Sequence, residues 1–174
     1  GTDSCKLGIT SSMGLNRAVS ETLEEMDLSD PLVRQMHVKM SGCPNGCGQH
    51  HIADIGFHGA AAKGPGGQVP AYELFVGGSY DDADARIGQR VRGRVPAKKV
   101  PEAMKRILRF YQDERNDGEL FKDFVVRQTS KAFEPLLKGL EETRKLDRDS
   151  IEAYMDWDKT VIYKVERGEG ECAL

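Results

Sequence analysis

The chain has 174 residues, which is enough for one domain of ordinary size with an appendage. Hydrophobic residues make up 39% and charged residues 30%, so the composition predicts a packed core, and the net charge of −3 excludes a strong general attraction to nucleic acid or anionic membranes. The sequence contains neither an apolar run of the roughly 18 to 20 residues that cross a bilayer nor a recognisable signal peptide. We therefore expect a cytoplasmic protein without nucleic-acid or membrane partners.

Two features of the sequence bear on its origin. The first residue is Gly1 rather than Met, and GTDSCKLGIT has the composition of a loop, so we expect a fragment of a longer protein. The even number of cysteines allows disulfides, but the lack of a secretion signal favours a reducing compartment, where clustered thiols more often bind metal or do redox work. The four cysteines are Cys5, Cys43, Cys47 and Cys172.

The first half of the chain predicts one helix and three strands. Residues 11–28 have apolar residues at helical spacing, and Ser11 or Ser12 can cap this helix. Residues 36–42 alternate between apolar and polar side chains, which predicts a strand that ends at Gly42. Residues 52–57 and 72–78 predict two more strands, and we expect the glycine-rich stretch 59–70 between them to be a flexible connection.

The second half begins with a basic run and continues into helices. The run, residues 86–99, holds six basic residues and no acid, namely Arg86, Arg90, Arg92, Arg94, Lys98 and Lys99. Residues 100–118 predict an amphipathic helix with Pro101 in its first turn, and residues 119–127 close this region. We therefore expect a domain over 1–128 and a C-terminal extension over 129–174, with a helix, a short strand at 159–165 and a loose end.

The motif SGCPNGCGQHH, residues 41–51, holds the most specific chemistry in the sequence. Because Pro44 suits a first helical turn, we expect Cys43 at the head of a short helix and Cys47 one turn later on the same face. The helix N-terminus stabilises thiolates, and Gly46 and Gly48 leave space for a bulky group. This arrangement favours a metal centre.

The residues alone leave three interpretations of this motif. Zinc would use Cys43 and Cys47 with His50 or His51, although these histidines lie too near in sequence to complete a good tetrahedron. A turn with inert thiols is the second, and an iron–sulfur cluster, which usually needs four thiolates, is the third. For a cluster, Cys5 supplies a third thiolate and the fourth lies outside the chain. The histidines themselves, His37, His50, His51 and His58, are expected to be surface or packing residues.

A family resemblance favours the cluster. GTDSCKLGIT, a spacer and VKMSGCPNGCGQHHIADIGFHG resemble the siroheme and 4Fe–4S region of assimilatory nitrite and sulfite reductases, and YELFVGG, RIGQRV, VPEAMKRIL and FKDFVVR follow in the family's order. The resemblance covers about residues 1–128. It implies an α/β (α+β) fold with a mixed sheet and packed helices, the C-terminal siroheme and 4Fe–4S domain of the nitrite/sulfite reductase fold.

The resemblance also implies ligands. Cys5 corresponds to the second cysteine of a C-x5-C pair whose first member lies two residues before Gly1, and Cys43 and Cys47 correspond to the second pair. Cys47 would then be the thiolate that bridges the cluster and the siroheme iron. Asn45, Gly46 and Gly48 are expected to place N–H groups around the sulfur atoms, with simple turn formation as the alternative.

The implied function is six-electron reduction of nitrite to ammonia or of sulfite to sulfide. GQHHIADIGF favours nitrite and Gly46 favours sulfite, and we prefer nitrite slightly. The 4Fe–4S cluster and siroheme belong to the full-length protein, so we expect the fragment alone to hold them incompletely and to be inactive. An alternative function from a different class of protein is a stand-alone iron–sulfur or zinc module that serves electron transfer or structure.

The expected partners are nitrite or sulfite, the N-terminal domains of the same chain, and ferredoxin or another electron donor. The basic run would contact siroheme carboxylates or an acidic ferredoxin, or it is simply a solvated face. Ferredoxin docking would weaken steeply with salt. We expect Cys172 to be an exposed thiol near a disordered end rather than a ligand.

Overall fold

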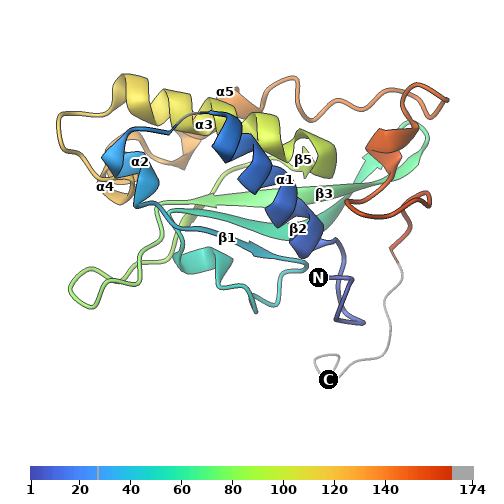
Figure 1. The fold of residues 1–174 in the computed structure, drawn as a ribbon, viewed down its shortest axis with the longest axis horizontal. Coiled ribbons are helices and arrows are strands. Elements are labelled where there is room, and N and C mark those ends of the chain that lie inside the picture. Colours follow the sequence, from blue (N-terminus) through green and yellow to red (C-terminus); the bar gives the residue numbers. More distant parts are fainter. Residues whose placement is uncertain (27, 166–174) are drawn as a thin grey trace.

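The computed structural model describes residues 1–26 and 28–165, and these residues contain a five-stranded mixed sheet (Figure 1). β1 (Val38–Ser41) runs parallel to β2 (Ile55–Gly64), which pairs antiparallel with β3 (Gly67–Val76). The short strands β4 (Gln89–Arg90) and β5 (Val95–Pro96) both pair antiparallel with β3. The three strands predicted in the first half of the chain are confirmed, and two of them are longer than expected.

The expectation of a flexible connection over 59–70 is wrong. β2 and β3 continue through this stretch as one long hairpin, in register from Ile55 opposite Val76 to Gly64 opposite Gly67. Gly67 has a φ of 133°, which suits glycine and allows the tight turn at Pro65 and Gly66. Local composition indicates a loop here, but the cross-strand hydrogen bonds between distant residues decide the structure.

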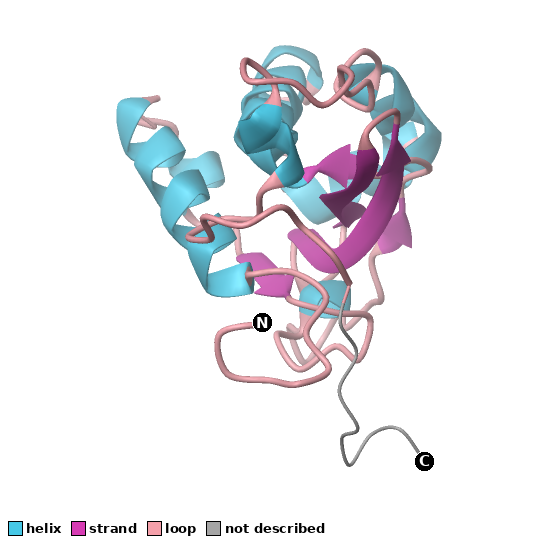
Figure 2. Cartoon of the chain, turned by 90° about the vertical axis from the view of Figure 1, so that its right-hand side faces the viewer, coloured by secondary structure: helices cyan, strands magenta, loops and turns pink. Residues whose placement is uncertain are grey.

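Helices cover one face of the sheet, on the upper and left-hand side of the strands in Figure 2. α1 (Ser12–Glu25) is capped by Ser11, whose hydroxyl oxygen accepts a hydrogen bond from the Gly14 amide. α3 (Val100–Glu114) has Pro101 in its first turn. α2 (Pro31–Arg34) and α4 (Phe121–Gln128) complete this layer. Both long predicted helices are confirmed, with earlier ends.

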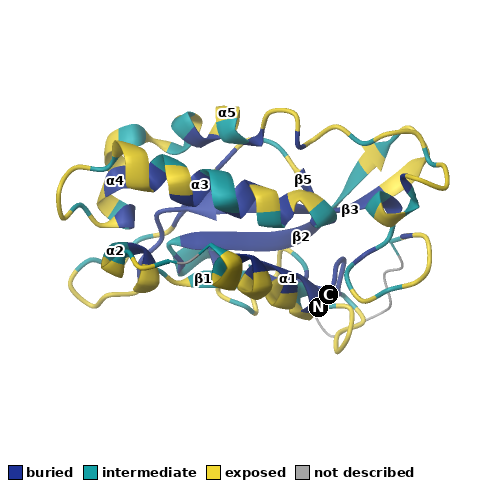
Figure 3. Ribbon diagram, turned by 45° about the horizontal axis from the view of Figure 1, so that its top comes forward, coloured by how far each residue is buried: buried dark blue, intermediate teal, exposed yellow. Residues whose placement is uncertain are grey.

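The core lies between this helical layer and the sheet, as the dark-blue strands of Figure 3 show. Alternate residues of β2 and β3 face the helices, and the buried face of α3 packs against them. The fully buried side chains of this core include Ile55, Phe57, Tyr72, Leu74, Val76, Met104, Ile107 and Tyr111. The predicted fold class, a mixed sheet with packed helices, is confirmed.

The opposite face of the sheet meets a 3-10 helix, η1 (His50–Ile52). Gly56 of β2 makes this contact possible, because a Cβ atom there would lie 1.8 Å from the His50 carbonyl oxygen. Histidine and charged side chains also lie on this face of the sheet.

The C-terminal extension packs onto the rest of the chain through η3 (Ser130–Phe133), α5 (Glu134–Leu137) and η4 (Ile151–Tyr154). The strand predicted at 159–165 is not formed; a single β-bridge joins Met155 and Ile162 around a turn in which Asp158 has a φ of 59°. The predicted loose end and Cys172 lie outside the described residues. Over the described ranges, no helix is long and apolar enough to cross a membrane.

Candidate functional site

The loop between β1 and η1 carries Cys43 and Cys47, and it is a series of turns rather than the predicted short helix. In a helix that starts at Pro44, the Gly48 amide would bond the Pro44 carbonyl. Here the Gly48 amide instead donates to the Ser41 hydroxyl oxygen at 3.1 Å. Gly46 has a φ of 78°, a left-handed backbone conformation that interrupts a right-handed helix. The helix prediction is therefore wrong for this loop.

The loop that carries Cys5 lies directly beside this cysteine loop. The Gly42 carbonyl, which precedes Cys43, accepts hydrogen bonds from the amides of Ile9 at 2.8 Å and Thr10 at 3.0 Å. A Cβ atom on Gly42 would lie 2.4 Å from the Gly1 Cα, so only glycine allows this approach. The fold thus joins two cysteine-bearing segments that are far apart in sequence.

The thiols of Cys5, Cys43 and Cys47 are free, and those of Cys5 and Cys47 are exposed. Among the residues that the structure describes, no three cysteine, histidine or acidic side chains gather closely enough to hold a metal ion. This finding applies both to the three thiols and to the zinc set with His50 or His51. The donor atoms suit an iron–sulfur cluster, and their segments are adjacent, but the side chains do not yet converge.

The expected N–H groups around the sulfur atoms are only partly free. The Gly48 amide is engaged by Ser41, and a Cβ atom at Gly48 would lie 2.1 Å from the Met40 carbonyl oxygen. Gly48 therefore serves the packing of the loop against β1. Asn45 is exposed, and the Gly46 carbonyl accepts the Gln49 amide at 2.7 Å.

Three of the four histidines form a cluster with Phe75 on the face of the sheet that η1 covers. The rings of His50 and His51 lie 3.8 Å apart between centroids, and the His50 and His58 rings lie 5.0 Å apart. His50 is fully buried, with its Nδ1 atom 2.8 Å from the Ser41 hydroxyl oxygen. The expectation that the histidines are surface or packing residues agrees with these positions.

The environment of His50 keeps its ring neutral. Burial, and then the nearby His51 and His58, lower the pKa of His50 to about 4. Its Nε2 atom is buried and has no hydrogen-bond partner among the described residues. Sequence reasoning missed this cluster, because it depends on the register of β2 against β3 and on the position of η1.

The basic run is partly neutralised by acidic partners. Glu73, a buried residue of β3 opposite His58, pairs with Arg90 at 2.7 Å and with Arg94 at 3.0 Å. Within the described chain, Arg92, Lys98 and Lys99 have no ion-pair partner, and the Lys98 ammonium lies over the Trp157 ring. The outward positive charge of residues 86–99 is therefore smaller than the sequence indicates.

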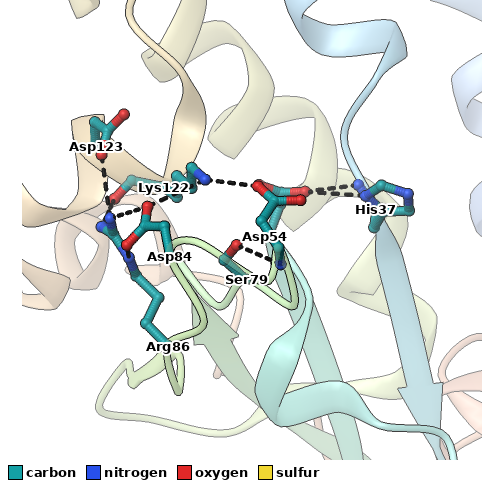
Figure 4. Close-up of polar contacts among 8 residues, drawn as sticks. His37, Asp54, Ser79, Asp84, Arg86, Lys122 and Asp123 are labelled. Atoms are coloured by element: carbon teal, nitrogen blue, oxygen red, sulfur yellow. Dashed lines mark hydrogen bonds and ion pairs between the residues drawn. The ribbon is translucent and has the colours of Figure 1, made fainter.

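A second cluster of charged side chains lies where the loop between β3 and β4 meets α4 (Figure 4). Lys122 of α4 binds Asp81 at 2.7 Å and Asp84 at 3.1 Å, and Arg86 binds Asp84 and Asp123. These contacts hold the loop between β3 and β4 against α4.

In the same region, the Asp54 carboxylate accepts the His37 amide at 2.8 Å and lies 3.6 Å from the His37 ring. Burial raises the pKa of Asp54, and its contacts with His37 oppose the rise. This pair joins the start of β1 to the start of β2. It was not identified from sequence, since no motif connects the two residues.

The comparisons with known proteins agree with this geometry. Residues 1–144 match the family described as the nitrite and sulphite reductase 4Fe-4S domain. The chain is 34% identical over 109 residues to the sulfite reductase (NADPH) hemoprotein beta-component of Bacillus licheniformis, and 34% identical over 110 residues to the protein of the same name from Staphylococcus carnosus. Each alignment covers 63% of this chain and 17% of the relative.

A solved structure, that of the Mycobacterium tuberculosis NirA protein, resembles the chain with a TM-score of 0.57 and 29% identity. This match covers 70% of the chain and 22% of NirA. The family match and the fold thus identify the class of the chain as a nitrite and sulphite reductase 4Fe-4S domain. The chain belongs to the nitrite and sulfite reductase family, and it spans 17% of the length of the curated relatives named above.

Proposed function

We propose that the chain is the cluster-bearing part of a reductase that transfers six electrons to nitrite or sulfite. The observation that carries this proposal is the contact at Gly42, where the Cys5 loop meets the loop of Cys43 and Cys47. Two adjacent loops with three free thiols form one side of a four-thiolate ligand set. The fourth ligand of such a set is not among these three cysteines.

The roles of the residues follow from this arrangement. Cys5, Cys43 and Cys47 are the residues that would hold the cluster, and Cys47 would be the thiolate shared with the siroheme. When bound, the siroheme would supply an iron centre for reduction of the substrate and the cluster would supply electron-transfer capacity beside it. Ser41 and Gly48 hold the Cys47 loop against β1, while Asn45 and Gly46 line its open side.

The substrate is a small oxyanion. The names of the curated relatives favour sulfite, whereas the local sequence GQHHIADIGF favours nitrite, so both belong in one assay. The full-length protein that contains this chain is supplied with a one-electron donor, and consumption of nitrite and of sulfite is measured in parallel. The ratio of the two kcat/KM values assigns the substrate.

The ligand roles have a direct test in the same full-length protein. We expect Cys43→Ser and Cys47→Ser to lose most bound iron and nearly all activity, because a serine hydroxyl is a poor cluster ligand. Cys172→Ser is the matched control and retains both iron and activity. Full iron content in Cys47→Ser contradicts the proposal, and zinc in place of iron favours a stand-alone metal module instead.

The electron donor is a ferredoxin or another small redox protein. Because Arg90 and Arg94 are paired with Glu73, Arg92 and Lys99 are the exposed residues of the basic run most available for an acidic donor, and Arg92 serves as the test position. Docking through Arg92 makes the KM for the donor rise in Arg92→Gln and rise with salt in the wild type. A KM that is flat in salt and unchanged in Arg92→Gln assigns the run to a solvated face.

A further inference from the structure

The C-terminal extension reaches back to the Cys5 loop, which comprises residues 1–11. Residues 154–163, here called the C-terminal strap, form a turn closed by the Tyr163 amide, which donates to the Tyr154 carbonyl at 2.7 Å. Figure 1 shows the strap in red at the same end of the molecule as the blue N-terminal loop. The contacts between the two segments connect residues about 150 positions apart in sequence.

Asp156 makes the most buried of these contacts. Its side chain is 3% exposed, and its Oδ2 atom accepts a hydrogen bond from the Ser11 amide at 2.7 Å. Its Oδ1 atom accepts from the Trp157 amide at 2.8 Å, so each carboxylate oxygen has a donor. A hydrogen bond from a buried amide to a carboxylate is among the stronger kinds in proteins.

Two further contacts join the strap to the same loop. The Tyr163 hydroxyl, which is also buried, donates to the Ile9 carbonyl at 2.9 Å. The Lys159 ammonium lies 2.9 Å from the Asp3 carboxylate, and the other oxygen of Asp3 accepts from the Ser11 hydroxyl at 2.7 Å. The strap therefore holds the loop at its start and at its end.

These contacts reach Cys5 through the backbone of the loop. The Thr10 carbonyl accepts the Thr2 amide at 3.1 Å, the Gly1 carbonyl accepts the Cys5 amide at 3.0 Å, and the Cys5 carbonyl accepts the Gly8 amide at 3.0 Å. Beside Cys5 the strap leaves a cavity of about 340 Å³. The strap thus fixes the base of the loop without packing over the thiol.

We propose that the C-terminal strap is a positioning element for the Cys5 thiolate, with Asp156 as its main positioning residue. On one side Gly42 binds the loop to the segment of Cys43 and Cys47, and on the other side Asp156 and Tyr163 hold it. The two sets of contacts together set where Cys5 lies relative to the other two cysteines. The part of this inference that concerns the cluster rests on the proposed function.

The test is hydrogen exchange at the amides of Thr2, Cys5 and Gly8, none of which bonds to the strap directly. In Asp156→Ala we expect these amides to exchange about tenfold faster, because the loop loses a charge-assisted hydrogen bond. Tyr163→Phe keeps the ring and removes one neutral hydrogen bond, so we expect a rise of about fivefold. Asp156→Asn keeps one carbonyl acceptor and restores part of the protection.

Asp158→Asn is the matched control. It lies on the strap but pairs with Arg17 of α1 rather than with the loop, and asparagine tolerates its positive φ. Its loop amides exchange at the wild-type rate. Unchanged exchange at Thr2, Cys5 and Gly8 in Asp156→Ala overturns the proposal. An equal rise at the amides of β2 and β3 does so too, since it reports global unfolding.

A second arm uses the full-length protein with its cofactors. The electron paramagnetic resonance spectrum of the reduced cluster changes in Asp156→Ala and stays as in the wild type in Asp158→Asn. An unchanged spectrum in Asp156→Ala, together with faster loop exchange, contradicts the link to the cluster. If the wild-type protein holds no cluster, the proposed function fails, whereas the exchange arm still decides whether the strap holds the loop.

Discussion

His50 lies buried between η1 and β2, and its neutral ring makes the stability of the protein depend on pH. The pKa of His50 is about 4 in the folded state against an ordinary value of 6.5. Above pH 6.5 the ring is neutral in both states and the dependence vanishes. As the pH falls from 6.5 to 4 the unfolded state binds the proton first, so the folded state loses about 3 kcal/mol.

We therefore predict that His50→Asn flattens this part of the stability profile. Asparagine keeps a polar atom near the position of Nδ1, beside the Ser41 hydroxyl, but it does not titrate. Urea unfolding at several pH values between 4 and 7 measures the slope in both proteins. Equal slopes in His50→Asn and the wild type would show that His50 does not cause the dependence.

Gly56 tests how closely η1 packs on the sheet. A methyl group at this position would meet the His50 carbonyl oxygen at 1.8 Å, and backbone atoms on both sides cannot yield cheaply. We predict that Gly56→Ala costs about 1 to 3 kcal/mol in the free energy of unfolding. It also raises the pKa of His50 toward 6.5, as measured by NMR titration, because η1 moves away and water enters.

The control for this change is Gly118→Ala, at a position with open space around it and a φ of 68°. It costs about 1 kcal/mol through backbone strain alone and leaves the pKa of His50 unchanged. A His50 pKa that stays near 4 in Gly56→Ala argues against the close packing of η1.

At the scale of elements, the loop between β3 and β4 is held to α4 by Lys122. Its ammonium group lies between Asp81, which is exposed, and Asp84, which is partly exposed. We predict that Lys122→Met lowers the free energy of unfolding by less than about 1 kcal/mol, because exposed ion pairs contribute little. The amides of Ser79 and Arg86, which bond each other's carbonyls, nevertheless exchange faster as the loop opens.

Lys105→Met is the control, since Lys105 pairs with Glu25 on the helical layer, away from the loop. We expect the Ser79 and Arg86 amides to exchange at the wild-type rate in this variant. Exchange at these amides that is as slow in Lys122→Met as in the wild type would show that the β-bridge alone holds the loop.

The sequence predicts those elements whose signals are local. The apolar spacing of residues 11–28 and 100–118 identifies both long helices, and alternation identifies the strand before the cysteines. The hairpin over 59–70 was missed because pairing between distant strands leaves no local mark. The helix expected at Pro44 was wrong because the Ser41 hydroxyl captures the Gly48 amide, a contact that spacing does not reveal.

The candidate site divides in the same way. The cysteines, their spacing and the family resemblance are visible in the sequence, and the comparisons confirm the family. The histidine cluster and the pairing of Arg90 and Arg94 with Glu73 depend on strand register, so they appear only in three dimensions. The contact of the strap with the Cys5 loop joins opposite ends of the chain, beyond any local pattern.

For the whole molecule, the ligand count predicts how much iron the 174-residue chain holds by itself. Within the residues that the structure describes, it offers three thiolates to a cluster that normally has four. After anaerobic reconstitution with iron and sulfide, we predict fewer than about four irons per chain and no reduction of nitrite or sulfite. Metal analysis and visible absorption measure this, and a stable full cluster on the isolated chain contradicts it.

The hydrogen bonds at Gly42 also bear on the order of assembly. Cys5 and Cys43 are separated by 38 positions, and bringing such distant points together in a flexible chain costs about 3 kcal/mol in loop-closure entropy. In this fold the Gly42 carbonyl joins the two segments with backbone contacts alone. These hydrogen bonds offset part of that entropy cost independently of any cofactor. Part of the geometry that the proposed cluster would need is therefore set by the polypeptide backbone rather than by metal ligation, in contrast to a zinc finger, whose fold depends on its metal.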